Sequence, residues 1–243
     1  MTKPFSSGTN EFFLTASSPC PYLPDRQERK IFTFLGGEGA SRLNAALSQR
    51  GFRRSQNIAY LPACDRCQAC RPVRVPVATF DTAKWRRLVR RNRDIVRVPR
   101  APRTTSEQFS VLRAYLDQRH ADGGMADMTV LDYTAMVEQT PVDTLVVEYR
   151  DSEERLIGCA LTDRLTDGLS MVYSFFDPDD QARSPGSYMI YDHVEFAASL
   201  GLDYIYLGYW IAGSPKMEYK RRFSPLEELT PEGWVPLVTG EAE

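Results

Sequence analysis

The chain has 243 residues, a formal net charge of −2, 42% hydrophobic residues and 26% charged residues. These values are ordinary for a globular protein with a substantial core, and no apolar run approaches the roughly 20 residues that span a bilayer. Residues 1–19 also lack the continuous apolar segment of a secretory signal. We therefore expect a cytoplasmic protein with no membrane partner and with reduced cysteines.

The first hundred residues are expected to mix helical and extended segments. A short amphipathic helix is predicted over 41–51, and residues 55–63 and 71–77 are extended or β-prone. Asp81 is placed to cap a basic helix, which continues to the proline-containing linker Pro99–Arg103. We therefore predict an N-terminal domain over residues 1–100.

The pattern of helices and strands predicted for residues 101–243 indicates a second domain. Thr105 and Gln108 form a capping-box pattern ahead of one helix, and a second helix is predicted over 130–138. Hydrophobic patterning then predicts further elements: strands over 144–150, 156–163 and 169–176, a helix from Ser187 to Gly201, and a strand over 204–210. The predicted fold class is α+β.

Three cysteines recur at two-residue spacing. Cys64, Cys67 and Cys70 form a CxxCxxC motif, and Cys20 is a candidate fourth ligand. In a reducing compartment this spacing favours a metal site over disulfides, and four thiolates suit zinc or an iron–sulfur cluster. Free thiols around a structural turn are the alternative. Cys159 lies in an apolar run and is expected in the core.

Positive charge is concentrated in one segment. Residues 84–103 contain nine Lys or Arg residues and one acid, Asp94. Helical spacing places five arginines on or beside one face, which predicts contact with the phosphates of a polyanion: Arg86, Arg87, Arg90, Arg91 and Arg93. A solvated charged face is the alternative, although nine cations would repel one another there.

Two further segments carry candidate binding chemistry. Residues 181–188 connect a predicted strand to a predicted helix, and Arg183 to Gly186 match the RxxG part of a pyrophosphate-binding loop. Residues 204–223 begin as an apolar aromatic strand and end in a basic, aromatic cluster. That cluster predicts an anion-binding surface.

Four stretches of the chain resemble the aminoacyl-tRNA–protein transferase family, and more closely its bacterial aspartate/glutamate leucyltransferase branch. They occur in the family's order: CPYLPDRQER, RGFRRSQNIAYLPACDRCQACRPVRVPV, RLTDGLSMVYSFFDP and YIYLGYWIAGSPKMEYKRRFSPLE. The resemblance implies a cysteine-bearing N-terminal region joined to a GNAT-type acyltransferase fold. It also implies transfer of leucine from leucyl-tRNA to proteins with N-terminal Asp or Glu, within the N-degron pathway.

Three alternatives remain open. An arginyl-tRNA–protein transferase would have the same acceptors, and a GNAT enzyme would use acetyl-CoA, although Tyr188 would hinder close approach of a pyrophosphate. A non-catalytic, metal-supported tRNA-binding module would explain the cysteines and the basic helix. It would leave the C-terminal half unexplained.

The implied reaction is aminolysis of an activated ester, which requires no cofactor and no covalent intermediate. Asp177 is the first choice to orient or deprotonate the amine, and Tyr206, Tyr209 and Tyr188 are candidates for proton relay or for holding the terminal adenosine.

Recognition of an acidic acceptor needs a cation. Arg74 lies between Val73 and Val75, and we expect its lone charge to point into the interior. A surface position at a strand edge is equally compatible with the pattern. Rival or additional substrate-binding residues come from the basic, aromatic cluster: Lys216, Tyr219, Lys220 and Arg222.

Overall fold

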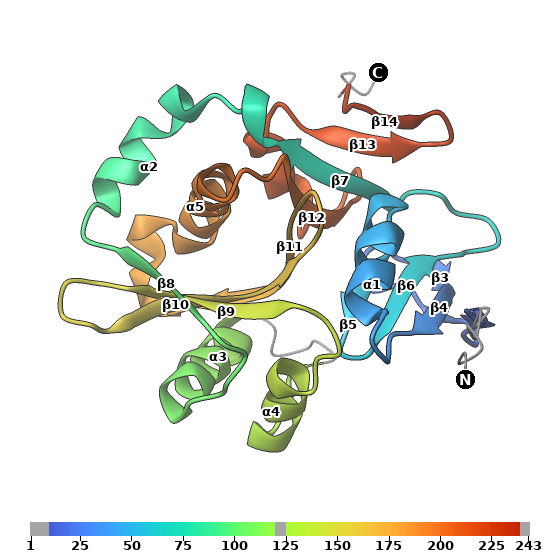
Figure 1. Cartoon of the computed structure of the whole chain (residues 1–243), viewed down its shortest axis with the longest axis horizontal. Helices are drawn as coiled ribbons and strands as arrows, with labels where there is room; N and C mark the ends of the chain where they lie inside the picture. The colour runs from blue at the N-terminus through green and yellow to red at the C-terminus, as the bar shows by residue number, and fades with distance from the viewer. Residues whose placement is uncertain (1–9, 120–124, 239–243) are drawn as a thin grey trace, which may run out of the picture.

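The computed structural model describes residues 10–119 and 125–238, and an eight-stranded sheet forms its centre (Figure 1). The strand order is β14-β13-β7-β12-β11-β10-β9-β8. In that order the strands are Gly233–Pro236, Glu227–Thr230, Arg71–Pro76, Tyr204–Trp210, Gly168–Phe176, Leu156–Arg164, Thr144–Arg150 and Val96–Arg100. The α+β class predicted from the sequence is confirmed.

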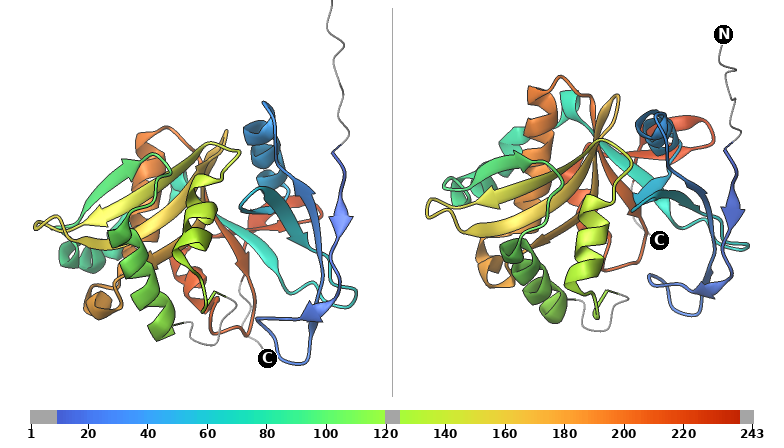
Figure 2. Two further views of the ribbon diagram at one scale, coloured as in Figure 1. Left: turned by 90° about the horizontal axis from the view of Figure 1, so that it is seen from below. Right: turned by 60° about the horizontal axis from the view of Figure 1, so that its bottom comes forward.

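Helices cover both faces of this sheet. Helices α3 (Ser106–Arg119) and α4 (Val130–Glu138) lie together under one face, while α5 (Pro185–Ser199) lies on the other (Figures 1 and 2). Eight of the nine residues of β10 are buried, because this central strand is covered from both sides. That explains why its first six residues, LIGCAL, form a continuous apolar run rather than an alternating one.

Helix boundaries follow local signals. The predicted capping box is confirmed: the Gln108 backbone N–H donates to Thr105 Oγ1 at 3.2 Å, and the Thr105 backbone N–H donates to Gln108 Oε1 at 3.1 Å. The α5 helix begins at Pro185, two residues before the predicted start. Proline is favoured in a first turn because its missing N–H would have no partner there.

A second, smaller sheet lies beside the first. Its order is β1-β4-β6-β5, formed by Phe13–Leu14, Lys30–Phe34, Ile58–Pro62 and Arg53–Ser55. The α1 helix (Ala40–Gln49) packs on one face of this sheet, where Leu35, Leu47 and Ala59 share an apolar cluster. A short hairpin of β2 (Ser18–Pro19) and β3 (Gln27–Glu28) precedes β4.

The boundary expected at residue 100 does not separate two sheets. Strand β7 pairs with β12, and β8 pairs with β9, so the first hundred residues supply two strands of the central sheet. The Pro99–Arg103 linker is likewise wrong at its start, because Pro99 belongs to β8. Proline is tolerated there because β8 is an edge strand.

The basic helix is shorter than predicted. Asp81 caps a 3₁₀ turn, Thr82–Trp85, and α2 covers only Arg86–Arg91. Asn92 ends the helix, and its side-chain amide donates to the carbonyls of Leu88 and Arg183. The chain is thereby free to extend into β8.

The β11 and β12 strands separate after a short parallel contact. They pair only from Gly168 opposite Tyr204 to Ser170 opposite Tyr206. This fork follows a strand, two helices, three antiparallel strands, a helix and a parallel strand, which is the element order expected for the GNAT-type fold. The β13–β14 hairpin completes the sheet and was not predicted.

Candidate active site

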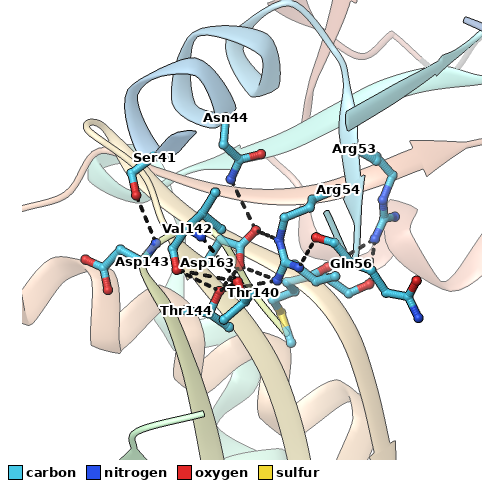
Figure 3. Close-up of polar contacts among 12 residues, drawn as sticks. Ser41, Asn44, Arg53, Arg54, Gln56, Thr140, Val142, Asp143, Thr144 and Asp163 are labelled. Atoms are coloured by element: carbon cyan, nitrogen blue, oxygen red, sulfur yellow. Dashed lines mark hydrogen bonds and ion pairs between the residues drawn. The ribbon is translucent and has the colours of Figure 1, made fainter. Parts of the chain in front are cut away.

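Two consecutive arginines of β5 point in opposite directions, because side chains alternate along a strand. Arg54 is 4% exposed and binds Asp163 of β10 with two hydrogen bonds of 2.6 Å. Asn44 of α1 and Thr144 of β9 donate to the same carboxylate, as Figure 3 shows. This buried network joins the small sheet to the central sheet.

Arg53 enters the fork between β11 and β12. Its Nη2 donates to the carbonyls of Met171 and Val172 at 3.2 and 2.9 Å, and Nη1 donates to the Leu207 carbonyl at 3.4 Å. These carbonyls lie where the two strands have stopped pairing. Within the described residues Arg53 has no salt bridge, so its positive charge is held by neutral oxygens alone.

A bulge in β12 makes room for this guanidinium. The β12–β7 register shifts between Tyr206 and Gly208, and Gly208 has a φ of +75°. A Cβ atom at Gly208 would lie 1.6 Å from Arg53 Nη1. Glycine is therefore required both by the backbone conformation and by the close approach of Arg53.

Lys220 is a second cation at the fork. Its side chain is 3% exposed, and its ammonium donates to the Tyr209 carbonyl and contacts the Met217 sulfur at 3.4 Å. Burial, with repulsion from Arg53 as a smaller cause, holds the pKa of Lys220 well below its ordinary value. The fork therefore holds two basic side chains, Arg53 and Lys220, that both donate to carbonyls of β12.

The expectation of a lone charge at Arg74 is wrong. Arg74 Nε forms an ion pair with Glu227 at 2.7 Å. Its guanidinium also stacks between the rings of Tyr204 and Trp234, at 3.5 and 4.3 Å from their centroids. The charge is compensated inside the protein, so this residue contributes to packing at the β7–β13 junction.

The tyrosines of β12 are engaged within the protein. Tyr206 donates to Asp167 at 2.8 Å, and Tyr209 donates to the carbonyl of Gly51 or of Tyr60, at 3.0 and 3.2 Å. Burial raises the pKa of both hydroxyls, so both stay protonated at neutral pH. Of the two, Tyr209 lines a large cavity next to the small sheet.

Asp177 and Tyr188 lie at the β11–α5 connection. The Asp177 carboxylate accepts from the Asp179 N–H at 3.0 Å and from Arg155 at 2.9 Å. Tyr188 is half-buried beside Tyr149, and burial raises the pKa of its hydroxyl to about 12. The structure thus brings neither residue to Arg53 by any direct contact within the described chain.

The basic cluster after β12 is mostly on the surface. Lys216, Tyr219 and Arg222 are exposed, and Tyr219 lies 5.9 Å from the Lys220 ammonium. Arg222 lines a surface cavity of about 320 Å³ together with Arg221. Sequence reasoning identified Lys220 but missed Arg53, whose signal was an arginine pair at the start of a strand.

Comparison with known proteins decides the family. Residues 18–88 match a family model described as the N terminus of arginine-tRNA-protein transferase, and residues 107–230 match the corresponding C terminus. The chain belongs to the arginine-tRNA–protein transferase family. Members of this family take the transferred amino acid from aminoacyl-tRNA.

Three curated relatives of this transferase are each named aspartate/glutamate leucyltransferase. The relative from Nitrobacter hamburgensis is 59% identical over 95% of this chain and 93% of its own length. Those from Afipia carboxidovorans and Rhodopseudomonas palustris strain TIE-1 are 57% and 55% identical, covering 95% and 98% of this chain and 94% and 96% of their own lengths. Among solved structures, L-PGS from Bacillus licheniformis has a TM-score of 0.43 at 12% identity, covering 62% of this chain and 50% of that one, which is too distant to bear on the fold.

Four of the five cysteines of this transferase line one cavity of about 480 Å³: Cys20, Cys64, Cys67 and Cys70. Burial, followed by the neighbouring thiols, raises the pKa of Cys70 to about 12. The donor chemistry suits zinc or an iron–sulfur cluster. However, within the described chain no three His, Cys, Asp or Glu residues are arranged to hold a metal ion, so the metal site stays a prediction.

Five arginines in and just after α2 are exposed: Arg86, Arg87, Arg90, Arg91 and Arg93. Arg91 donates to the Ala182 carbonyl at 2.8 Å. In the part of the chain that the structure describes, these five form no salt bridge, which leaves their charge available to an RNA substrate. None of the described helices is both long and apolar enough to span a membrane.

Proposed function

We infer that the chain transfers leucine from leucyl-tRNA to the α-amine of proteins that begin with Asp or Glu, and so marks them for degradation in the N-degron pathway. The names of the highly similar relatives support this inference. One structural observation carries it further: Arg53 holds a permanent positive charge in the fork, and no carboxylate within the described residues compensates it.

We propose Arg53 as the group that binds the acceptor's side-chain carboxylate, the role first assigned to Arg74. A carboxylate from the acceptor would supply the counter-ion that the fork lacks. A charge-assisted hydrogen bond contributes about 1.5–3 kcal/mol, which corresponds to roughly 10- to 100-fold preference for Asp over Asn.

The chemistry asks little of the protein beyond positioning. The amine lone pair attacks the ester carbonyl, an amide C–N bond forms, and the ester C–O bond breaks. The released ribose hydroxyl takes up a proton, and the amine gives one up. Because an α-amine has a pKa near 7.7–8.0, about a tenth or more is already neutral at pH 7. Holding both substrates at the fork then supplies most of the rate gain.

The other predicted roles stay proposals. Asp177 would orient the amine after release from Arg155, while Tyr209, Tyr188 and Lys216 would contact the tRNA end or the acceptor. We place the reaction in the cytoplasm, where aminoacyl-tRNA is available. A metal at the cysteines would support the fold around their cavity. Metal analysis of the purified protein, with Cys64→Ser as the comparison, tests that last proposal.

The test is a transfer assay with leucyl-tRNA and arginyl-tRNA as donors and with peptides beginning with Asp, Glu, Asn or Ala. We expect leucine transfer to the Asp and Glu peptides only. Transfer of arginine instead of leucine would favour the arginyl-tRNA alternative. No transfer of either amino acid would favour a binding module.

Arg53→Gln and Arg74→Met are compared in the same assay. We expect Arg53→Gln to lower kcat/KM for the Asp peptide by roughly 10- to 100-fold, with unchanged tRNA affinity. Arg74→Met should keep the wild-type ratio of Asp to Asn transfer, because its charge is already compensated by Glu227. An unchanged Asp-to-Asn ratio in Arg53→Gln would rule out the role given to Arg53.

A further inference from the structure

The small sheet has one covered face and one open face. On the face toward α1, Thr33, Leu35 and Ala59 are at most 3% exposed. The opposite face carries a row of side chains across all four strands, because directly paired residues share a face. The row is set by three pairings, Phe13 with Phe32, Phe32 with Tyr60, and Tyr60 with Arg53.

The outer end of this row is an exposed aromatic cluster. Phe13 and Phe34 are 42% and 56% exposed. Their rings lie 5.9 Å apart, and each lies within 5.8 Å of the Phe32 ring. Several large aromatic rings left together on a surface usually mark a binding site. We call Phe13, Phe32 and Phe34 the aromatic platform.

The inner end of the row leads to the fork. The Tyr60 ring lies 6.4 Å from Tyr209, and both residues line the cavity of about 480 Å³. From Phe13 to Arg53 the row crosses three strand spacings, or about 14 Å. The aromatic platform and Arg53 therefore lie at the two ends of one row of side chains, and Tyr60, within that row, lines the cavity.

Charge along this surface favours RNA. The cavity is lined by Arg26, Lys30, Arg50 and Arg71 but by a single acid, Glu28. Arg26 and Arg50 have no salt bridge within the described residues. Exposed aromatic rings followed by unpaired cations are the combination that binds single-stranded nucleic acid, with bases on the rings and phosphates on the cations.

We propose that the aromatic platform binds the single-stranded 3′ end of the aminoacyl-tRNA and delivers its terminal ester along the row to the fork. Unpaired bases stack on Phe13, Phe32 and Phe34, and the phosphates that follow lie near Arg26 and Arg50. Base stacking on aromatic rings does not depend on base identity, so this surface recognises an unpaired end rather than a sequence. The proposal rests on the proposed function only in taking aminoacyl-tRNA as the ligand.

Two double variants separate stacking from simple apolar contact. Phe13→Leu with Phe34→Leu keeps apolar bulk but removes the π-faces, whereas Phe13→Tyr with Phe34→Tyr retains them. Both positions are exposed, so both variants should fold. Binding is measured by fluorescence anisotropy with uncharged leucine tRNA and with the same tRNA lacking its three unpaired 3′-terminal nucleotides.

We expect the Leu variant to bind intact tRNA roughly 5- to 100-fold more weakly and the shortened tRNA as the wild type does. The Tyr variant should bind both as the wild type does. Leu131→Ala, at a residue 78% exposed on α4, serves as the control for loss of a surface apolar group and should change neither affinity.

The proposal would be overturned if the Leu variant bound the intact tRNA as tightly as the wild type does, and the shortened tRNA likewise. If the same variant raised KM for the acceptor peptide, the platform would belong to the protein substrate instead. Because binding is measured without transfer, a wild-type protein that transfers no leucine would refute the proposed function but not the RNA site.

Discussion

The two faces of β5 each carry an arginine, and the two arginines have opposite electrostatic surroundings. Arg54 is buried against Asp163 and fully compensated, whereas Arg53, the preceding residue, lies in the fork on neutral carbonyls. Strand alternation alone sends them to opposite sides. Whether the charge of each arginine is compensated thus depends on whether a carboxylate lies on its side of the strand.

The buried Arg54–Asp163 pair adds little to stability, but it determines where Arg53 lies. Burying an ion pair gains little net stability, but removing one partner leaves a charge without compensation in the interior. The Arg54–Asp163 pair also fixes β5 against β10, and with it the entry of Arg53 into the fork. We therefore regard Arg54 as a positioning residue for Arg53.

Removing the carboxylate that compensates Arg54 should have the largest effect on stability. Asp163→Asn leaves Arg54 buried without its counter-ion, and we expect a loss of about 3–5 kcal/mol in the free energy of unfolding, measured by urea denaturation. Asp143→Asn is the control, because its 3.9 Å pair with Arg164 is about half exposed and should change stability by less than about 1 kcal/mol. Similar losses in both variants would contradict a special role for the buried pair.

Adding a side-chain atom next to the Arg53 guanidinium should have an intermediate effect on stability and should also lower leucine transfer. Gly208→Ala places a Cβ atom against Arg53 at a φ of +75°. We expect a stability loss of about 1–3 kcal/mol and leucine transfer at least as low as in Arg53→Gln. Gly201→Ala has the matching strain, with a φ of +68° and nothing within 4 Å of the added atom. It should lose stability but keep transfer, and a parallel loss of transfer would argue against displacement of Arg53.

Removing uncompensated charge from the surface should have the smallest effect. Arg86→Gln and Arg90→Gln should leave stability within about 0.5 kcal/mol. Each should lower the slope of log affinity for tRNA against log salt concentration by about 0.7–0.9, if that side chain contacts one phosphate. Arg42→Gln, an exposed arginine of α1, is the control. Unchanged salt slopes in the α2 variants would remove α2 from the tRNA-binding surface.

Local patterns predicted the elements well where periodicity was strong. The Thr105–Gln108 capping box and the strands over 144–150 and 156–163 appear as expected, because their signals come from neighbours in the chain. The α2 helix was predicted too long, because the basic run continues through Arg97 and Arg100 while the helix stops at Asn92. The density of positive charge does not predict where the helix ends.

Long-range pairing was the part that local patterns missed. Arg74 looked like a lone cation, because Glu227 lies 153 residues away along the chain. The domain boundary near residue 100 failed to divide the sheets for the same reason, since β7 and β12 are distant in sequence but adjacent in space. The residues next to Arg74 do not reveal Glu227, and the residues of β7 do not reveal its pairing with β12.

By itself the sequence determined the α+β class, most helices and strands, and, through four extended stretches, the family. Those features depend on local periodicity, capping and residue identity, which are all present in the linear chain. Only the tertiary structure decided which arginine lacks a carboxylate partner within the described residues. A charge is compensated or uncompensated according to what the fold brings within about 4 Å, and the fork, the buried Asp163 and the open aromatic face come together only after distant strands have paired.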